Sequence, residues 1–406
     1  MDKGRFMEKE SKKKLGIYIH IPFCIRKCLY CDFLSAPAAG QEQARYLEAL
    51  CKEIETESRG YCGYEVQSVY LGGGTPSVFA GEWIEQILDT LYRRYQIGAK
   101  CEISMEVNPG TLTRDKLAAY KRGGVNRLSI GLQSTDNGEL AALGRIHSWE
   151  DFCRSYELIA RAGFENLSID LMSGIPGQSC VSWQRSLERV KALSPAPKHI
   201  SAYSLIIEEG TPFFETPPEL PDEDTDREMY KITNDILKAG GYGRYEISNY
   251  ALPGYECRHN LSYWRRENYA GFGIGAASLI GNTRFRNTAD RQAYERFYLE
   301  DSGAGFAGGE IKEEKQVLRI EEQMEEFMFL GLRMSKGVSK QEFFRCFGKE
   351  IEEVYPGVVE DFCKKGLLQR QKDCETAEER IFLTDYGVDI SNYVMAEFLI
   401  SFWERH

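Results

Sequence analysis

Long apolar runs are missing from this sequence. Nowhere do about 18 apolar residues follow one another, which is the length a helix needs to cross a bilayer. The lysine-rich N-terminal tail, residues 1–14, is followed by no apolar segment of signal-peptide length. We therefore predict a chain that stays in the cytoplasm.

Positive charge is also scarce. The chain carries 51 Lys and Arg against 62 Asp and Glu, a net charge of −11. A nucleic-acid surface calls for clustered positive charge, so this balance argues against general nucleic-acid binding. A small ligand or another protein is the expected partner.

Cysteines are too few for a disulfide scaffold, with twelve in 406 residues. Nine of them are scattered without regular spacing, as expected of reduced thiols. The remaining three, Cys24, Cys28 and Cys31, lie close together directly after a strand-like run, LGIYIHI.

Short runs rich in β-branched and aromatic residues alternate with helix-length segments. The predicted strands are 15–21, 66–72, 101–107, 126–131, 166–171 and 199–204, and the predicted helices between them are 43–57, 82–95, 114–124, 149–164 and 183–193. Strict alternation implies parallel strands with helical crossovers. Six such units fall short of a closed eight-unit barrel, so we predict an α/β fold: a partial, open-sided (β/α)6 barrel over residues 15–205.

The rest of the chain is less regular. Residues 206–300 are predicted to form an extension that closes the open side of the barrel. After a Gly-rich segment, 301–310, residues 311–406 show helices and a hairpin in an order that resembles a winged helix. Residues 310–406 hold 14 Lys and Arg against 21 Asp and Glu, a balance of −7, so an accessory packing domain is favoured over a DNA-binding one.

The cysteine triad carries the main chemical signal. It follows the first predicted strand, at the end of a barrel where active sites lie. Three thiolates can hold three irons of a cubane cluster and leave the fourth iron open to a small molecule. Spacing alone leaves two alternatives: a zinc site, which would need a fourth ligand, or three free thiols.

The pattern Cys-x3-Cys-x2-Cys after a first strand resembles the signature of the radical S-adenosylmethionine (SAM) superfamily. GGGTPS (72–77), just after the second strand, is similar to the superfamily's glycine-rich segment. The resemblance implies a [4Fe-4S] cluster on Cys24, Cys28 and Cys31 and a bound SAM. In that superfamily, electron transfer from the cluster cleaves the sulfonium to a 5′-deoxyadenosyl radical.

Four further motifs follow at successive strand ends: MEVNPG (105–110), GLQS (131–134), LGRIHS (143–148) and IDLMSGIPGQ (169–178). Together they resemble the oxygen-independent coproporphyrinogen oxidase branch. That resemblance implies SAM contacts at Tyr18, Tyr30, Gly74, Thr75, Glu106, Gln133, Arg145, Asp170, Ser204 and Leu279. Carboxylates suit ribose hydroxyls or an amino group and an arginine suits a carboxylate, although each residue taken singly could serve loop structure instead.

The oxidases of this branch carry a further cysteine two residues after the triad, where this chain has Phe33. Phe33 and the motif RHNLSYW (258–264) resemble the heme chaperone subfamily. That resemblance implies heme binding at His259, delivery of heme to acceptor hemoproteins that include membrane-bound respiratory enzymes, and a cluster-linked homodimer.

An imidazole is a suitable heme ligand, and Tyr263 and Trp264 could pack on the macrocycle, with Cys257 as a candidate second ligand. The alternative is that His259 hydrogen-bonds a loop under the barrel while the aromatic residues belong to the core.

The sequence thus predicts a heme chaperone of the radical SAM type. Two enzyme hypotheses stay open: oxidative decarboxylation of coproporphyrinogen III, against which Phe33 argues, and methyl transfer by a related radical SAM enzyme.

Overall fold

The computed structural model describes residues 12–300, 311–372 and 377–400. Most of the predicted basic tail, residues 1–14, and the Gly-rich segment 301–310 lie outside the described residues. Within the described part of the chain, no helix is both long enough and apolar enough to cross a membrane.

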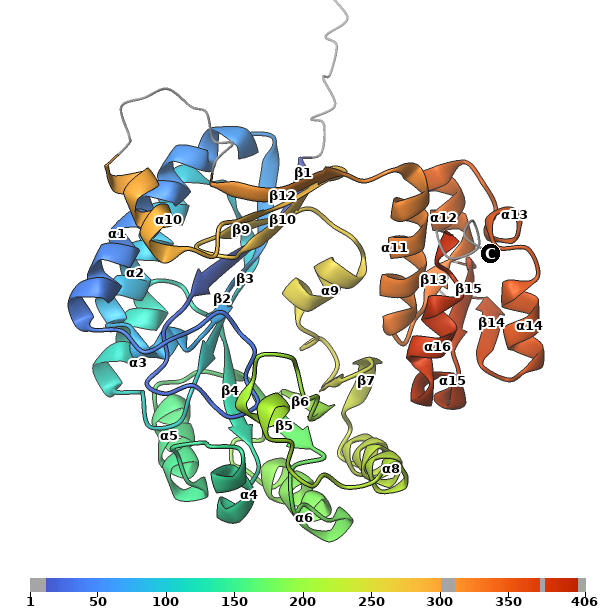
Figure 1. The fold of residues 1–406 in the computed structure, drawn as a ribbon, viewed down its shortest axis with the longest axis horizontal. Coiled ribbons are helices and arrows are strands. Elements are labelled where there is room, and N and C mark those ends of the chain that lie inside the picture. The colour runs from blue at the N-terminus through green and yellow to red at the C-terminus, as the bar shows by residue number, and fades with distance from the viewer. Residues whose placement is uncertain (1–11, 301–310, 373–376, 401–406) are drawn as a thin grey trace, which may run out of the picture.

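A curved sheet of parallel strands forms the centre of the molecule (Figure 1). Its six successive parallel strands are β1 (Lys13–Ile21), β2 (Tyr64–Gly73), β3 (Ile97–Val107), β4 (Arg127–Gln133), β5 (Asn166–Ser173) and β6 (His199–Ser204). Strands β4 and β5 are almost wholly buried, and their apolar residues alternate with polar ones such as Ser129 and Asp170. The apolar side chains pack under the helices that cover one face of the sheet. The predicted (β/α)6 arrangement is confirmed.

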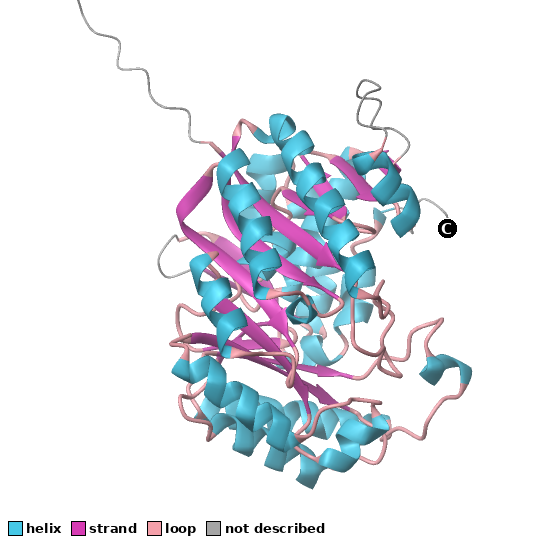
Figure 2. Ribbon diagram, turned by 90° about the vertical axis from the view of Figure 1, so that its left-hand side faces the viewer, coloured by secondary structure: helices cyan, strands magenta, loops and turns pink. Residues whose placement is uncertain are grey.

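The crossover helices lie side by side over the outer face of the sheet (Figure 2). They are α1 (Gly40–Glu57), α2 (Gly81–Arg94), α3 (Arg114–Arg122), α4 (Asn137–Ala142), α5 (Trp149–Arg161) and α6 (Cys180–Lys191). Side-chain caps start several of them, such as Ser148 Oγ on the backbone N–H of Asp151. Short 3₁₀ turns, Ser58–Tyr61 and Pro76–Val78, complete the crossovers.

Residues 206–300 lengthen the sheet at both edges. The added elements are α7 (Pro212–Glu215), α8 (Glu223–Ala239), β7 (Gly243–Glu246), β8 (Asn249–Ala251), α9 (Arg258–Trp264), β9 (Tyr269–Phe272), β10 (Ala277–Ile280), β11 (Thr283–Asn287) and α10 (Arg291–Leu299). Strands β8 and β7 continue from β6, and β9, β10 and β11 continue from β1.

The extension does not close the barrel by strand pairing. Within the described residues the outermost strands of the sheet do not pair with one another, so the sheet stays open. Helix α9 lies on the inner face, against β2, and the C-terminal domain faces the open side across α9 (Figure 1).

The predicted start of the C-terminal domain at residue 311 also shifts. Residues 312–317 form β12 (Lys312–Val317), which pairs antiparallel with β11 and belongs to the main sheet. Its residues, KEEKQV, are mostly charged or polar and lie at least partly exposed, so they show no alternation of apolar and polar residues that would predict a strand.

The C-terminal domain has its own core, built around residues such as Met328, Phe343 and Phe362. Its elements are α11 (Ile320–Arg333), β13 (Val338–Ser339), α12 (Lys340–Phe347), α13 (Ile351–Val354), α14 (Val358–Lys364), β14 (Leu368–Lys372), β15 (Glu379–Leu383), α15 (Asp385–Asp389) and α16 (Ser391–Ala396). Helix, strand, helices and an antiparallel hairpin follow in winged-helix order, with β13 paired to β15.

This domain docks on the inner side of the barrel through α9. The Arg333 guanidinium lies over the ring of Trp264, 4.5 Å from its centre. The backbone N–H of Ser335 donates to the carbonyl of Tyr245 at 3.0 Å. A domain that uses its first helix to pack on the barrel fits the accessory role expected from its negative charge.

A buried carboxyl group, Glu53 of α1, joins this helix to the segment that extends the sheet beyond β1. It accepts hydrogen bonds from the backbone N–H of Gly273 (2.7 Å), from Nδ2 of Asn287 (2.6 Å) and from the hydroxyl of Tyr294 (2.6 Å). These partners come from the segments that add β9 to β11 and α10, so one side chain ties the extension to the barrel. Burial raises the pKa of Glu53 to about 7.

We expect Glu53→Ala to lower the free energy of unfolding by about 3 kcal/mol, because it leaves several buried donors without an acceptor. The matched control is Glu48→Ala on the exposed face of the same helix, which should stay within about 0.5 kcal/mol of the parent. Urea unfolding followed by circular dichroism measures both. Equal stability of the two variants would contradict the anchoring role of Glu53.

Candidate functional site

A cavity of about 540 Å³ opens at the carboxyl ends of the parallel strands. This is the edge of a (β/α) barrel where ligands bind. Its wall brings together most of the residues predicted from sequence: Cys24, Cys28, Tyr30, Cys31, Gly74, Thr75, Glu106, Gln133, Arg145, Asp170 and Ser204. These residues come from the ends of all six parallel strands and the loops that follow them.

The loop after β1 presents the three cysteines as free, partly exposed thiols. Contacts with distant segments hold it in place. The backbone N–H of Leu29 donates to the carbonyl of Leu143 (3.1 Å), and an Arg26 guanidinium nitrogen donates to the carbonyl of Gly144 (2.6 Å). Nε2 of His20 lies 2.9 Å from the carbonyl of Leu34, so His20 also supports this loop.

The glycine-rich segment after β2 packs directly against the cysteine loop. The backbone N–H of Gly74 donates to the carbonyl of Ile21 and that of Thr75 to the carbonyl of Phe23, at 2.9 and 2.7 Å. A Cβ atom at Gly74 would lie 2.7 Å from the Phe23 carbonyl oxygen, so a side chain does not fit. The hydroxyl of Thr75 lies 3.4 Å from Sγ of Cys24.

Arg145 connects three walls of the cavity. Its guanidinium donates to the carbonyl of Gly131 (2.5 Å) and to Oδ1 of Asn108 (3.0 Å), and lies 3.5 Å from Sγ of Cys28. Its buried Nε has no hydrogen-bond partner among the described residues. A buried cation beside the cysteines, with a donor left over, suits an anionic ligand group.

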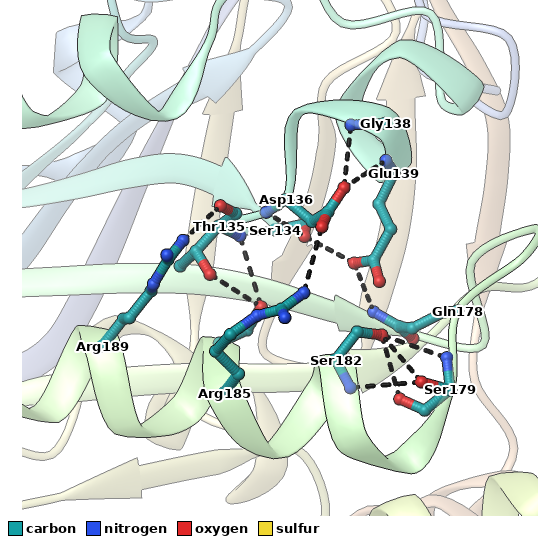
Figure 3. A network of polar contacts seen from close by, with 11 residues as sticks. Ser134, Thr135, Asp136, Gly138, Glu139, Gln178, Ser179, Ser182, Arg185 and Arg189 are labelled. Atoms are coloured by element: carbon teal, nitrogen blue, oxygen red, sulfur yellow. Dashed lines mark hydrogen bonds and ion pairs between the residues drawn. The ribbon is translucent and has the colours of Figure 1, made fainter.

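A polar network fixes the segment that leads to Arg145 (Figure 3). It joins the loop after β4 and helix α4 to the β5–α6 loop. Glu139 accepts from the hydroxyl of Ser134 and from Nε2 of Gln178, and Asp136 pairs with Arg185 at 3.1 Å. The network thereby holds the strand end that carries Gln133 and the turn that carries Arg145.

Gln133 sits at a bulge where β4 loses register with β5. Its φ of 72° lies in the left-handed region, which is unusual for a residue with a side chain and often marks a functional position. The hydroxyl of Tyr203 donates to its Oε1 at 3.1 Å. The bulge turns the Gln133 amide toward the cavity.

Two partly buried carboxyl groups, Glu106 and Asp170, line the cavity. Burial is the main cause that raises the pKa of Glu106 to about 7, and burial also raises the pKa of Asp170. Tyr70 donates to Glu106 at 2.9 Å, and Ser129 donates to Asp170 at 3.0 Å. Such groups gain from a cationic ligand, which favours their ionised forms.

A second cavity, of about 500 Å³, adjoins the first. Asp32, Phe33 and Glu106 line both. Aromatic and small residues form the rest of the second wall, including Tyr18, Tyr263, Tyr269, Gly275 and Ala276. Tyr18, predicted for the SAM site, therefore lies in the second cavity and not on the wall of the first.

His259 lies behind the second cavity and is 1% exposed. Its Nδ1 is 2.9 Å from Oγ of Ser68 and its Nε2 is 3.0 Å from the hydroxyl of Tyr263, so both ring nitrogens are engaged. Burial is the main cause that lowers its pKa to about 3. In this arrangement His259 offers no free nitrogen to a heme iron, and heme binding at this residue stays a prediction.

Three residues near His259 in the sequence, Tyr263, Trp264 and Cys257, lie in different parts of the structure. Tyr263 reaches the second cavity, whereas Trp264 packs under Arg333 of the C-terminal domain and lines neither cavity. Cys257, a candidate second ligand, is wholly buried with Sγ 3.6 Å from a carboxylate oxygen of Glu102. Leu279 is buried in β10, and the structure does not bring it to either wall.

Some lining residues were missed at the sequence level. Asn108, Ser129, Tyr203 and Asn249 line the first cavity. Asn108 donates to the hydroxyl of Thr75 at 2.9 Å and so joins two strand ends. Its place in MEVNPG, directly after β3, was a signal that could have identified it.

The donor set fits a four-iron cluster. Three free thiols on one loop, an incomplete set for a cubane, face a cavity with polar groups for a chelating ligand. Zinc fits less well, because no three His, Cys, Asp or Glu side chains of the described residues converge as one metal ion requires. When bound, a cluster of this kind supplies single electrons to a ligand on its open iron.

Comparison with known proteins agrees with this geometry. Residues 18–190 match the Radical SAM superfamily, and residues 318–389 match the HemN C-terminal domain. The structure of coproporphyrinogen III oxidase (HemN) from Escherichia coli, a radical SAM enzyme, has the same fold: the TM-score is 0.80 at 21% identity, over 96% of this chain and 91% of that chain. Fold and site together define a radical SAM protein.

Sequence identity to curated relatives identifies the family within this class. Heme chaperone HemW from Bacillus subtilis (strain 168) is 37% identical over 387 residues, which are 94% of this chain and 98% of the relative. Heme chaperone HemW from Escherichia coli (strain K12) is 35% identical over 357 residues, 87% and 89% of the two chains. The chain belongs to the HemW family.

The partly buried carboxyl of Glu106 predicts a pH-dependent affinity for SAM, which carries a sulfonium cation. Because the pKa of Glu106 is about 7, most of this group is protonated at pH 6 and becomes ionised as the pH rises. We expect SAM to bind about fivefold more tightly at pH 7.5 than at pH 6.

Isothermal titration of the reconstituted protein at several pH values checks this expectation. Glu106→Gln should flatten the dependence, whereas Glu209→Gln, an exposed carboxyl outside both cavities, should keep it. The same pH profile in the Glu106→Gln variant would assign the dependence to another group.

Proposed function

We propose that this protein is a heme chaperone that binds heme next to a [4Fe-4S] cluster and SAM and passes the heme to acceptor hemoproteins. Membership of the HemW family supports the heme part, since relatives matched over nearly their whole length carry the name heme chaperone. The Radical SAM match over residues 18–190 supports the cluster and SAM.

One observation carries the proposal: a second cavity of about 500 Å³ with aromatic walls adjoins the cluster cavity. A flat, apolar macrocycle needs this kind of space and these side chains. Phe33, in the position where oxidases of this branch carry a further cysteine, lies at the border of the two cavities and lines both.

In the first cavity, Cys24, Cys28 and Cys31 would hold the cluster. Arg145 would bind the carboxylate of SAM through charge-assisted hydrogen bonds. Glu106 and Asp170 would accept hydrogen bonds from ribose hydroxyls or from the amino group.

Tyr30, Gln133 and Ser204 would line the neighbouring region, with room for a second SAM. The hydroxyl of Thr75, near Sγ of Cys24, and the backbone N–H of Gly74, bonded to the carbonyl of Ile21, would hold the cysteine loop against the end of β2.

The acceptors in this proposal, membrane-bound respiratory enzymes among them, would approach the loops around the first cavity. Apolar side chains are exposed there, notably Ile25 (56%), Phe33 (59%) and Ile206 (68%). Exposed apolar groups that gather around a cavity are typical of a surface used in protein contacts. A homodimer linked by the cluster would use the same surface.

A second candidate is a radical SAM enzyme that acts on a porphyrin, either by decarboxylation of coproporphyrinogen III or by methyl transfer. It is favoured by the gathering of most of the predicted SAM contacts around the first cavity. A heme carrier that performs no radical chemistry would not need these SAM contacts.

We expect replacement of Cys24, Cys28 or Cys31 by Ser to abolish reconstitution of four irons per chain, because a hydroxyl is a much weaker iron ligand than a thiolate. Iron content and visible absorbance after anaerobic reconstitution measure this. Cys62→Ser, at an exposed free cysteine outside both cavities, is the control and should retain full iron content. Full iron content in a triad variant would point to a different ligand set.

A single anaerobic experiment separates the two functions. The reconstituted protein receives reductant and SAM, with heme in one sample and coproporphyrinogen III in the other. We expect heme uptake and transfer to an apo-hemoprotein, followed by its Soret absorbance, and no protoporphyrinogen. Protoporphyrinogen formation without heme uptake would establish the enzyme and reject the chaperone.

A further inference from the structure

One side chain, Asn108, connects two of the three cysteines through their nearest polar neighbours. Nδ2 of Asn108 donates to the hydroxyl of Thr75 at 2.9 Å, and that hydroxyl lies 3.4 Å from Sγ of Cys24. On its other side, Oδ1 of Asn108 accepts from the guanidinium of Arg145 at 3.0 Å, and this guanidinium lies 3.5 Å from Sγ of Cys28. An unbroken chain of hydrogen bonds therefore runs from one sulfur to the other.

The direction of these hydrogen bonds follows from the chemistry of the groups. The Arg145 guanidinium can only donate, so the atom of Asn108 that faces it must be the carbonyl oxygen Oδ1. The amide nitrogen then faces Thr75 and donates to it. A hydroxyl that accepts this bond still has its own proton to donate, and the sulfur of Cys24 is within reach of that proton. Both sulfurs thus receive a hydrogen bond.

The backbone of Asn108 is held on both sides, which fixes where its amide points. Its N–H donates to Oγ of Ser77 at 3.2 Å, and its carbonyl accepts from the hydroxyl of Thr111 at 2.7 Å. A Cβ atom at Gly131 would lie 2.8 Å from Oδ1 of Asn108 and 3.0 Å from a guanidinium nitrogen of Arg145. The contact between Asn108 and Arg145 therefore requires a glycine at position 131.

Hydrogen bonds to the sulfur ligands are one of the means by which a protein sets the reduction potential of an iron–sulfur cluster. They stabilise negative charge on the thiolates, and the reduced cluster carries one more negative charge than the oxidised cluster. Donors at Cys24 and Cys28 therefore favour reduction. The third sulfur, Sγ of Cys31, has a different donor, the backbone N–H of Phe33, which lies outside this chain of side chains.

We propose that Asn108 is a positioning residue that raises the reduction potential of the cluster, because it directs the hydroxyl of Thr75 and the guanidinium of Arg145 toward the cysteine sulfurs. The inference rests on the proposed cluster at the three cysteines. The cluster takes up one electron from an external one-electron reductant, and no bond of the protein forms or breaks. Loss of the hydrogen bonds makes that electron harder to add.

Direct contact with SAM is the alternative role for Asn108, since this residue is part of the wall of the first cavity. A measurement made without SAM separates the two roles. A group that acts only on SAM leaves the reduction potential of the SAM-free cluster unchanged, whereas a group that acts on the cysteine sulfurs changes it.

The test is a redox titration of the reconstituted full-length protein without SAM or heme, followed by electron paramagnetic resonance of the reduced cluster. In Asn108→Asp, a carboxylate of nearly the same shape accepts the hydroxyl proton of Thr75 and so takes it away from Cys24. We expect the equilibrium constant for reduction to fall about tenfold, which is about 59 mV for one electron. The control, Asn392→Asp, adds the same charge at an exposed position outside the cavities and should keep the parent potential.

Thr75→Val tests the hydrogen bond without a change of charge. It removes the hydroxyl that reaches Cys24 and should lower the equilibrium constant for reduction about threefold. Thr75→Ser restores the hydroxyl and should recover most of the parent potential. Asn108→Ala is less informative, because a cavity of about 30 Å³ adjoins Asn108 and has room for a water molecule that replaces the amide.

Two results would overturn the inference. One is a parent-like potential in Asn108→Asp with full iron content. The other is a parent-like potential in Thr75→Val, which would mean that charge alone acts in Asn108→Asp, and this result counts even where Asn108→Asp does not fold. A parent protein that takes up no four-iron cluster would instead reject the proposed function on which the inference rests.

Discussion

The parallel register between β1 and β2 is the constraint on which the site depends. It pairs Ile21 with Gly73, so the two strands end together and the loops that follow them meet. The next residue, Gly74, lies so close to the backbone of Phe23 that a Cβ atom has no room. Main-chain hydrogen bonds therefore set the position of the cysteine loop. These bonds form whatever side chains line the cavity wall.

Helix α9 is the second organising element, and its seven residues serve three regions of the molecule. His259 packs on the inner face of the sheet, Tyr263 forms part of a cavity wall and Trp264 supports the C-terminal domain. Because α9 lies on the inner face and Tyr263 lines the second cavity, the barrel can enclose this cavity although its outermost strands do not pair. The winged-helix-like domain then covers the outer side of α9.

The alternating pattern of strands and helices predicted the barrel and most of the first cavity, because motifs that directly follow parallel strands must meet at one edge. The short edge strands β7 to β12 were not predicted, since runs of three to six residues are too short to show a readable alternation. The orientation of His259 was also beyond the local sequence: its ring is set by Ser68, which is 191 positions away. Leu279 was implied by the family resemblance alone, but it is buried in β10.

Phe33 gives the two cavities a common wall. Whatever occupies one cavity restricts the side chains that shape the other, because Phe33, Asp32 and Glu106 face both. Two ligands that share a wall cannot have independent affinities, and thermodynamic linkage makes the effect equal in both directions. In the proposed function, the affinity for heme would therefore depend on whether SAM is bound.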